Sequence, residues 1–431
     1  MKVFMLGWEF PPFISGGLGT ACYGLTKAMD QLGIKIDFVL PRTVESEYST
    51  HVELLTPGST RSKAYLKYKG FKNVRFLAID SPLRPYETAG VHGQHAEKIS
   101  AGKQRILGSD ASSAGRMGDG IDCSGDICTM VHRYAEAACK LAQGEQFDIV
   151  HAHDWMTYPA GVAVAAMSGQ PLVVHVHSTE FDRSGEHVNQ IIYDIERKGM
   201  HAADKVIAVS YLTRNIIITR YGVAEYKVEV VHNAVEQNDE EIILSNQTGI
   251  KRGEKIVLFL GRITMQKGPE YFLQAAKKVL EFMDNVKFVI AGDGDMMHQI
   301  IEMAVGLGIG HKVLFAGFLC EGDVKKAFDM ADLYVMPSVS EPFGIAALEA
   351  LNHDVPVLIS KQSGVSEILR NVLKVDFWDI NETANKMVSV LKNSPLQMTL
   401  REHGDLEVRK LRWQGAAEKC AKIYEELTVT V

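Results

Sequence analysis

The stretch Ile256-Val257-Leu258-Phe259-Leu260-Gly261-Arg262-Ile263-Thr264-Met265-Gln266-Lys267-Gly268 decides the fold of this chain. Its first five residues form a short apolar run, which is typical of a buried strand in a parallel sheet. The run leads into a loop that carries both Arg262 and Lys267. Arginine can bind two oxygens at once and lysine acts as a point charge, so the pair suits a diphosphate. The alternative is that both residues are solvated surface cations.

Similar apolar runs recur along the whole chain, and each is followed by a longer amphipathic stretch. This alternation predicts an α/β protein with parallel sheets covered by helices. The expected strands are residues 3–6, 36–40, 74–79, 149–151, 172–177, 206–209 and 228–231, and then 256–260, 286–291, 313–316, 333–336 and 355–359.

A polar stretch separates these strands into two groups, which predicts two large domains. The length of 431 residues fits two domains. We expect an N-terminal domain over residues 1–236, a linker over 237–253, a C-terminal domain over 254–400 and a C-terminal helix over 401–431.

Two further segments stand outside this alternation. The region of about residues 84–126 is rich in Gly, Ser and Asp and is long for a connection, which is typical of a functional lid or a mobile segment. Residues 401–431 carry apolar side chains at helical spacing. The helix they predict either packs on its own domain or crosses back to the first.

Composition excludes several classes of partner. The net charge of −7 and the lack of a basic block argue against nucleic acid. The six cysteines are scattered without a Cys-x-x-Cys pair, so we expect no disulfide framework and a reduced cytoplasmic location. The first apolar run is too short for a signal peptide or a membrane span. These features predict a cytoplasmic protein, and they make no prediction of its oligomeric state.

A glycine turn follows the first expected strand. Gly16-Gly17-Leu18 lies between that strand and a predicted helix. Such a turn lets a ligand approach the backbone, and the helix N-terminus offers N–H groups to a negative oxygen. The alternative is that the glycines only let the strand and helix pack.

A pair of carboxylates follows the expected strand at 333–336. Glu341 lies in a turn punctuated by Pro342 and Gly344, and Glu349 lies on the helix after it. A carboxylate can accept hydrogen bonds from two neighbouring hydroxyls of a ring. The pair can therefore hold a hexose and a ribose, while the amides of Phe343 and Gly344 face phosphate. The alternative is a solvated helix face.

Taken together, these motifs resemble the retaining GT-B glycosyltransferases, specifically the glycogen and starch synthase-like group and its relatives. The resemblance covers nearly the whole chain and implies two Rossmann-like domains facing across a cleft. Two motifs depart from it: Ile14 replaces a lysine of the bacterial synthases, and Asn233-Ala234-Val235-Glu236 replaces the usual Asn-Gly-Val-Asp. The motifs in chain order are Gly16-Gly17-Leu18, His151-Ala152-His153-Asp154-Trp155, His175-Val176-His177, Gly261-Arg262 with Lys267-Gly268, and Glu341 to Glu349.

The resemblance also implies roles for individual residues. Arg262 and Lys267 would bind the donor diphosphate, and Glu341 the sugar hydroxyls. His177 would touch the sugar near its reacting carbon, and Asp154 would be an acid facing the cleft. The remaining donor-binding residues that it implies are Gly16, Gly17, Leu18, His153, Gly292, Gly294, Phe318 and Leu319 (at the base), Pro342, Phe343, Gly344 and Glu349 (at the ribose).

The activity implied by the resemblance is transfer of a hexose, glucose first, from ADP-glucose or UDP-glucose to an α-glucan, with retention and without a metal or other cofactor. The alternatives are transfer of another hexose to a small-molecule or lipid acceptor, an inactive sugar-nucleotide sensor, and a phosphorylase or epimerase of the same fold.

Two metal sites remain as alternatives. Asp293-Gly294-Asp295 could bind a divalent metal that bridges the diphosphate. The four histidines His151, His153, His175 and His177 could form a zinc site, or could line the cleft and the core.

Overall fold

The computed structural model describes residues 1–11, 16–41, 71–78, 127–236 and 253–429, and the backbone of the short strands at 52–55 and 64–68. Position 14, the region 84–126 and nearly all of the expected linker lie outside the described residues. Within the described part of the chain, no helix is long and apolar enough to cross a bilayer.

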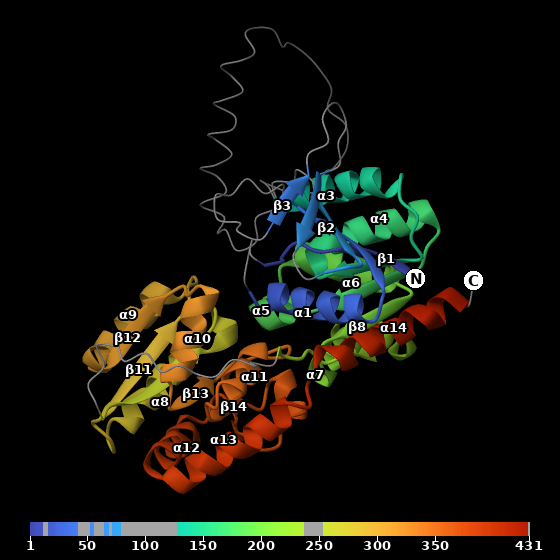
Figure 1. The fold of residues 1–431 in the computed structure, drawn as a ribbon. Helices are drawn as coiled ribbons and strands as arrows, with labels where there is room; N and C mark the ends of the chain where they lie inside the picture. Colours follow the sequence, from blue (N-terminus) through green and yellow to red (C-terminus); the bar gives the residue numbers. More distant parts are fainter. Residues whose placement is uncertain are drawn as a thin grey trace, which may run out of the picture.

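Two sheets form the centres of two domains (Figure 1). The described strands of the first sheet have the order β3-β4-β5-β2-β1-β6-β7-β8-β9, and all neighbours are parallel except at β4. These strands are β1 (Lys2–Leu6), β2 (Lys35–Leu40), β3 (Val52–Leu55), β4 (Ala64–Tyr68), β5 (Val74–Ala78), β6 (Ile149–His153), β7 (Leu172–Val176), β8 (Lys205–Ala208) and β9 (Val228–Val230).

The second sheet is parallel throughout, with the order β12-β11-β10-β13-β14-β15 in the described chain. Its strands are β10 (Lys255–Leu260), β11 (Val286–Ala291), β12 (Val313–Gly317), β13 (Leu333–Met336), β14 (Val357–Ser360) and β15 (Leu373–Val375). Both sheets confirm the predicted α/β class. The strands β3, β4 and β15 were not predicted.

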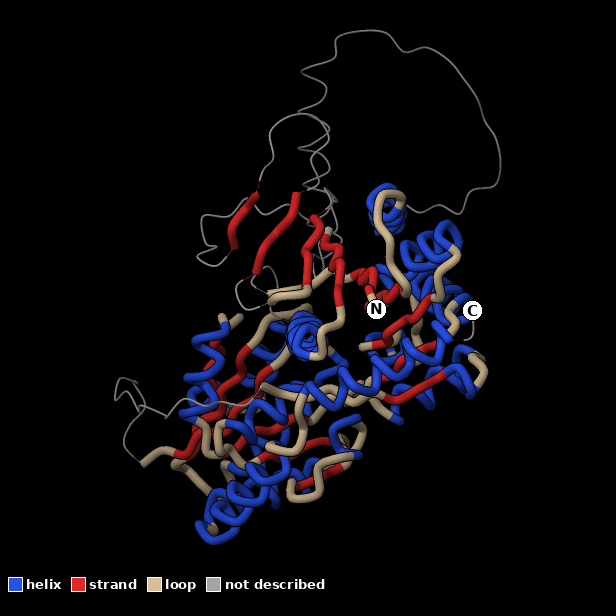
Figure 2. Tube along the Cα trace, turned by 45° about the vertical axis from the view of Figure 1, so that its right-hand side comes forward, coloured by secondary structure: helices blue, strands red, loops and turns tan. Residues whose placement is uncertain are grey.

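Helices pack against both sheets, as the tube view shows (Figure 2). In the first domain α3, α4 and α6 pack together, and in the second α8 packs between α9 and α12. The first-domain helices are α1 (Gly17–Gln31), α3 (Ile127–Ala142), α4 (Tyr158–Ser168), α5 (Glu180–Ser184), α6 (Gln190–Ala202) and α7 (Tyr211–Tyr221). The later helices are α8 (Pro269–Val279), α9 (Met297–Gly306), α10 (Glu321–Met330), α11 (Ile345–Asn352), α12 (Ile380–Lys392), α13 (Ser394–Val408) and α14 (Trp413–Val429).

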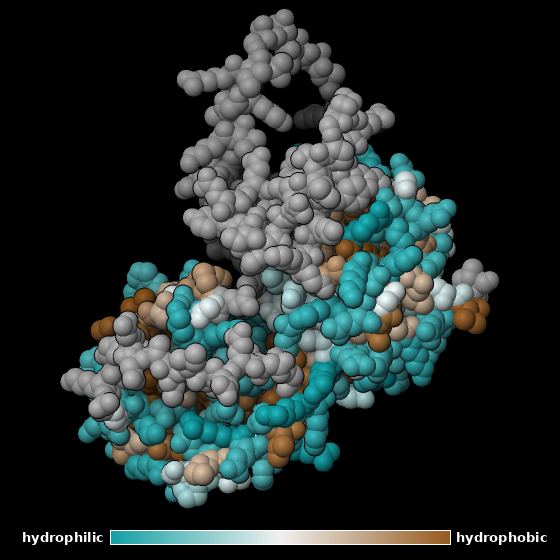
Figure 3. Space-filling view, in the orientation of Figure 1, coloured by the Kyte–Doolittle hydropathy of each residue, from teal (hydrophilic) through white to brown (hydrophobic). Residues whose placement is uncertain are grey.

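The core of each domain lies around its central strands. In β1 the residues from Val3 to Leu6 are fully buried, and in β13 all residues from Leu333 to Met336 are buried. Strands covered on both faces read as continuous apolar runs, which is why their positions could be predicted. The face in Figure 3 is largely hydrophilic over the described surface of both domains, with only scattered apolar residues.

The C-terminal segment is two helices, so the prediction of one helix from residue 401 was wrong. α13 ends at Val408 and packs against α11 of the second domain, whereas α14 packs against α1 of the first. One straight helix could not make both contacts. Of the two packing alternatives, the structure confirms that the chain crosses back, and Figure 1 shows both termini on the first domain.

A close fit holds α14 on α1. The indole of Trp413 lies against Gly24, where a Cβ would overlap the ring, and Tyr424 reaches His151 of β6 through its hydroxyl. Where the chain crosses between domains, the N–H of Val235 donates to the carbonyl of Leu411 over 3.5 Å. The outgoing and returning segments therefore touch.

Candidate active site

One cavity of about 1700 Å³ lies between the two domains. Its first-domain wall comes from the N-terminus of α1 and the segments after β6 and β7. Its second-domain wall comes from the segments after β10, β11, β12 and β13 and from α11. Ligands of open parallel sheets bind at the carboxyl ends of the strands, so this is the expected place for a site.

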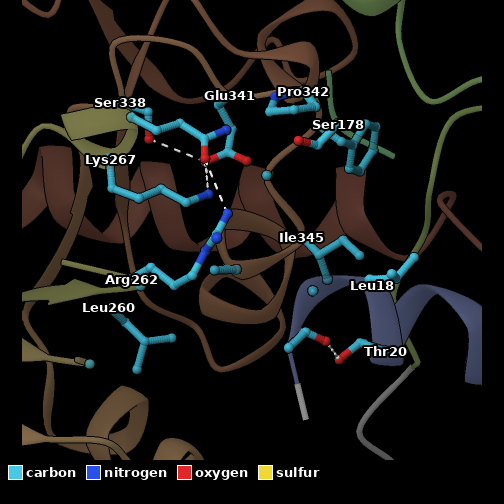
Figure 4. Close-up of a pocket in the computed structure, with 18 of the residues that line it drawn as sticks. Leu18, Thr20, Ser178, Leu260, Arg262, Lys267, Ser338, Glu341, Pro342 and Ile345 are labelled. Atoms are coloured by element: carbon cyan, nitrogen blue, oxygen red, sulfur yellow. Dashed lines mark hydrogen bonds and ion pairs between the residues drawn. The ribbon is translucent and has the colours of Figure 1, made fainter. Parts of the chain in front are cut away.

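The loop after β10 brings two cations to the cavity. The Lys267 ammonium lies 2.6 Å from the Glu341 carboxylate, and a guanidinium N–H of Arg262 donates to the Gln266 side chain over 3.2 Å. The hydroxyl of Ser338 donates to the same oxygen of Glu341 over 3.2 Å. Figure 4 shows Arg262 and Lys267 pointing toward Glu341 from one wall. The structure thus brings together three residues predicted from two separate motifs.

Backbone contacts fix the position of this cationic loop. The carbonyl of Gln266 accepts from the N–H of Val339 over 2.9 Å, which ties the loop to the segment before Glu341. On its other side, the N–H of Ile263 donates to the carbonyl of Asp293 over 2.9 Å. Gly292 has a φ of 137°, and a Cβ there would overlap the carbonyl of Gly261. Glycine is therefore required beside the cavity because the two backbones approach so closely.

The second carboxylate lies on α11. Gly344, with a φ of 107°, is the N-cap of this helix and turns the chain so that Glu341 and Glu349 both line the cavity. Both carboxylates lie near Tyr334, whose pKa is raised first by burial and then by their negative charge. Pro342 and Phe343 line the same wall. The two acids therefore act on one region of the site.

The residues predicted to hold the nucleobase, and the aspartates considered as metal ligands, also lie on the second-domain wall. Phe318 and Leu319 line the cavity, and the Phe318 side chain is 67% exposed. Asp293 and Asp295 line it as well, and the Asp293 carboxylate accepts from the N–H of Gly294 over 2.8 Å. Neither aspartate belongs to the groups of potential metal ligands found among the described residues.

In the first domain, the start of α1 faces the cavity through Gly16, Gly17 and Leu18. The first N–H groups of a helix have no partner within the helix. One of them, on Gly19, donates over 2.9 Å to the carboxylate of Glu9, which is fully buried. Sequence reasoning missed Glu9, because a carboxylate that bonds a backbone ten positions away has no local pattern.

Asp154 holds the segment that carries His177. Its backbone has a φ of 62°, and its carboxylate accepts from the N–H of His177 over 3.1 Å and of Ser178 over 3.3 Å. Burial raises the pKa of Asp154 to about 7, against the opposing effect of the Arg183 charge. Asp154 and His177 both line the cavity, as predicted, but Asp154 also fixes the backbone of its neighbour.

His153 does not lie where it was predicted. It is fully buried and is not part of the cavity wall; its Nδ1 lies 2.9 Å from Nε2 of His177. The correction follows from strand geometry, because residues two apart in β6 share one face, and this face is covered. Burial lowers the pKa of His177 well below its ordinary value, so its imidazole is neutral. His153 supports the ring of His177 instead of facing a ligand.

A charged network behind this wall was also missed. Arg183 bonds Ser178 over 2.9 Å and pairs with Glu180 and Glu196, and Glu180 and Arg183 both line the cavity. Asp182, in the same turn, accepts from the hydroxyl of Ser340 of the second domain over 2.6 Å. The pattern of a threonine three residues before an acid, which caps α5, was the available signal.

Two Rossmann-like domains that enclose a cavity at their strand ends form the GT-B fold. The comparisons agree: the model for glycosyl transferases group 1 matches residues 240–406, and that for glycosyltransferase family 4 matches residues 124–239. An uncharacterized glycosyltransferase of Methanocaldococcus jannaschii is 30% identical over 86% of this chain and 83% of its own. The chain belongs to the GT-B glycosyltransferase family.

More distant relatives match almost the whole length. A glycogen synthase of Mycobacterium tuberculosis is 23% identical over 98% of this chain and 94% of its own. The solved sucrose-phosphate synthase of Thermosynechococcus elongatus has a TM-score of 0.75 at 17% identity and covers all of both chains. This last likeness confirms the fold.

Proposed function

We propose that this chain transfers a hexose from a nucleoside diphosphate sugar to an acceptor hydroxyl, with retention at the anomeric carbon and without a divalent metal. The observation that carries the proposal is the convergence of Arg262, Lys267, Glu341 and Glu349 on one cavity that also receives the N-terminus of α1. This set supplies positive charge for a diphosphate and acceptors for sugar hydroxyls.

The donor's parts are assigned by chemistry. The diphosphate lies between the Arg262 and Lys267 side chains and the start of α1, where helix N–H groups favour an anion. Glu341 accepts from hexose hydroxyls and Glu349 from the ribose, while the base lies at Phe318. The cavity of about 1700 Å³ is larger than a small-molecule site of roughly 300–1,000 Å³. The remaining space accommodates an acceptor.

The reaction exchanges one bond at the anomeric carbon. The bond from this carbon to the diphosphate oxygen breaks, and the acceptor oxygen forms its bond on the same face of the sugar. The acceptor's proton passes to the departing phosphate oxygen, so no separate base is needed. The developing negative charge is stabilised by Arg262, Lys267 and the α1 amides, and fixed charges of this kind are usually the largest catalytic contribution. Neutral His177, fixed by Asp154 and His153, contacts the sugar.

For the finer identity we propose glucose as the transferred unit, ADP-glucose or UDP-glucose as its donor and an α-glucan as the acceptor. The support is the match to a glycogen synthase along almost the whole of both chains. Closure of the two domains around the donor would exclude water from the cation-like transition state. The hydrogen bond from the Ser340 hydroxyl to the Asp182 carboxylate, over 2.6 Å, links the two domains.

The test is a donor and acceptor panel. Purified protein is incubated with ADP-glucose, UDP-glucose and other nucleotide hexoses, with and without glycogen, and both nucleotide release and incorporation of labelled sugar are measured. Glycogen-dependent release with incorporation from a glucose donor supports the full proposal, and NMR of the product linkage tests retention. Transfer only to a small-molecule or lipid acceptor discards the glucan. Donor binding without turnover on any acceptor overturns the enzymatic reading in favour of a sensor.

A further inference from the structure

Three histidines converge in the core directly behind His177. His151 and His153 lie on one face of β6, and His175 lies beside them on β7. Their ring centroids are 4.4, 5.2 and 5.5 Å apart, and each ring offers a nitrogen within 4.8 Å of the others. None of the three side chains is more than 1% exposed. The cluster therefore forms a closed group of nitrogens inside the first domain.

Several of these nitrogens have no hydrogen-bond partner within the described chain. They are Nε2 of His151, Nε2 of His153 and both ring nitrogens of His175. The large majority of buried side-chain polar atoms in proteins are hydrogen-bonded, so four ring nitrogens without a partner at one place require an explanation. A bound ion is one explanation, because one nitrogen of each ring lies within 4.8 Å of a nitrogen of the other two, although the rings are stacked with interplanar angles of 18°, 18° and 28°.

The bonded nitrogens of the cluster are compatible with the tautomers that a metal ion needs. Nδ1 of His151 bonds the Tyr424 hydroxyl, and Nδ1 of His153 lies 2.9 Å from Nε2 of His177. The tautomer in which each Nδ1–H donates to its partner leaves the lone pair of both rings on Nε2. Ligating histidines typically bond a second group in this way through their other nitrogen. Burial lowers the pKa of all three rings, so they are in the neutral form that binds metal.

The thiol of Cys22 lies beside the cluster. Glu9 and Asp154 are buried, and both raise the pKa of the Cys22 thiol, after the larger effect of burial. The sulfur of Cys22 lies within 4.8 Å of a ring nitrogen of His153.

We propose that His151, His153 and His175 bind a divalent transition-metal ion of the class that prefers imidazole, with zinc as the reference member. Three imidazoles without a carboxylate suit zinc, cobalt, nickel or copper and not magnesium or calcium. A tetrahedral ion at about 2.1 Å from each nitrogen needs ligands about 3.4 Å apart. Because the three rings are stacked, with interplanar angles of 18°, 18° and 28°, each ring must turn about its Cβ–Cγ bond to direct its lone pair at the ion. The ion would join β6, β7 and, through Tyr424, the returning helix α14. It lies behind His177, so it would not contact the donor diphosphate.

The primary test measures metal content and cobalt binding. Full-length protein carrying no histidine tag is expressed with zinc and purified, and its zinc is counted by mass spectrometry; Co²⁺ is then added to metal-stripped protein. We expect about one equivalent of zinc and the intense visible absorption of tetrahedral Co²⁺. H175V should lose both, whereas H298A, which removes an exposed histidine, should keep both. Protein that stays metal-free under saturating zinc overturns the site and indicates ordered water in its place.

A second variant keeps the test valid if H175V fails to fold. Y424F preserves the aromatic ring on α14 and removes only the hydroxyl that bonds His151. Loss of such an orienting partner typically weakens metal binding 10–100-fold. We expect that weakening in a Co²⁺ titration, together with a smaller rise in melting temperature on adding zinc. A wild-type Co²⁺ affinity in Y424F contradicts the arrangement proposed for His151.

Discussion

Replacing Lys267 by methionine tests the proposed diphosphate site most directly. The substitution keeps the length of the side chain and removes its charge. In the structure the ammonium lies 2.6 Å from Glu341, and the two side chains are 20% and 8% exposed. Lys267 is therefore a partly desolvated cation held in place before the donor arrives. A preorganised charge of this kind acts in the transition state without reorganisation of its surroundings.

The expected fall in kcat follows from mutations at comparable anion-binding sites. Removing one donor from a preorganised anion-binding site lowers kcat about 10²–10³-fold, or about 2.7–4 kcal/mol in activation free energy. Folding stability should fall less, because Glu341 keeps the Ser338 hydroxyl at 3.2 Å. Loss of one charged hydrogen bond costs about 1–3 kcal/mol. Turnover should therefore fall much more than the melting temperature does.

Lys255 offers a matched control at the start of β10, the strand that leads into the loop of Lys267. Lys255 begins β10 and pairs with Asp332 over 2.8 Å, with side chains 35% and 21% exposed. K255M removes the same charge from a pair outside the cavity, so its turnover should match the wild type. Both variants are assayed for nucleotide release at saturating donor, well below their melting temperatures. A K267M enzyme with kcat within about threefold of K255M would refute the placement of the diphosphate.

Three further predictions concern the metal, the buried acid and the returning helix. Transfer activity should be unchanged by EDTA in protein whose zinc content is measured and retained, and a loss restored by manganese or magnesium but not by zinc would favour the acidic triplet after β11. Because burial raises the pKa of Asp154 from 3.8 to about 7, the folded chain keeps a proton that the unfolded chain has released. Its stability should therefore fall as pH rises through that window, by up to about 4 kcal/mol. D154N should flatten this fall in urea unfolding measured at several pH values, and an identical pH profile in both proteins would contradict the shift. G24A should lower the free energy of unfolding by about 1–3 kcal/mol, because the new methyl meets the Trp413 ring. G415A, in open space on α14, should not, and equal effects of the two would count against that packing.

The central strands could be predicted because burial on both faces gives them continuous apolar sequences. The ribbon formed by β3 and β4 is antiparallel at a sheet edge, where the sequence carries no such run. The break between α13 and α14 has no glycine or proline at Arg409 to Arg412. It exists because the two helices contact different domains, and long-range packing of this kind leaves no mark in a local window.

The site residues that could be predicted are those that directly follow the C-terminal end of a strand. Arg262, Lys267 and Glu341 come from segments after parallel strands, and such segments meet at one edge of the sheet. Supporting residues were harder to find. The Glu9 carboxylate accepts from the backbone N–H of Gly19, and the side chain of His153 is fully buried inside the first domain. Neither role follows from a local motif.

The double crossing of the chain limits how the domains can move. A single flexible tether would let one domain tumble and slide against the other. Here the outgoing segment near Val235 touches the returning segment at Leu411, and Asn352 of α11 bonds the carbonyl of Glu236 over 3.0 Å at the same place. Two chain segments that touch at this place should restrict sliding of one domain against the other more than rotation about the crossing point. Opening and closing of the cavity should therefore be mainly a rotation about this crossing point. Removing α14 would release the returning segment from the first domain and leave a single flexible connection between the domains.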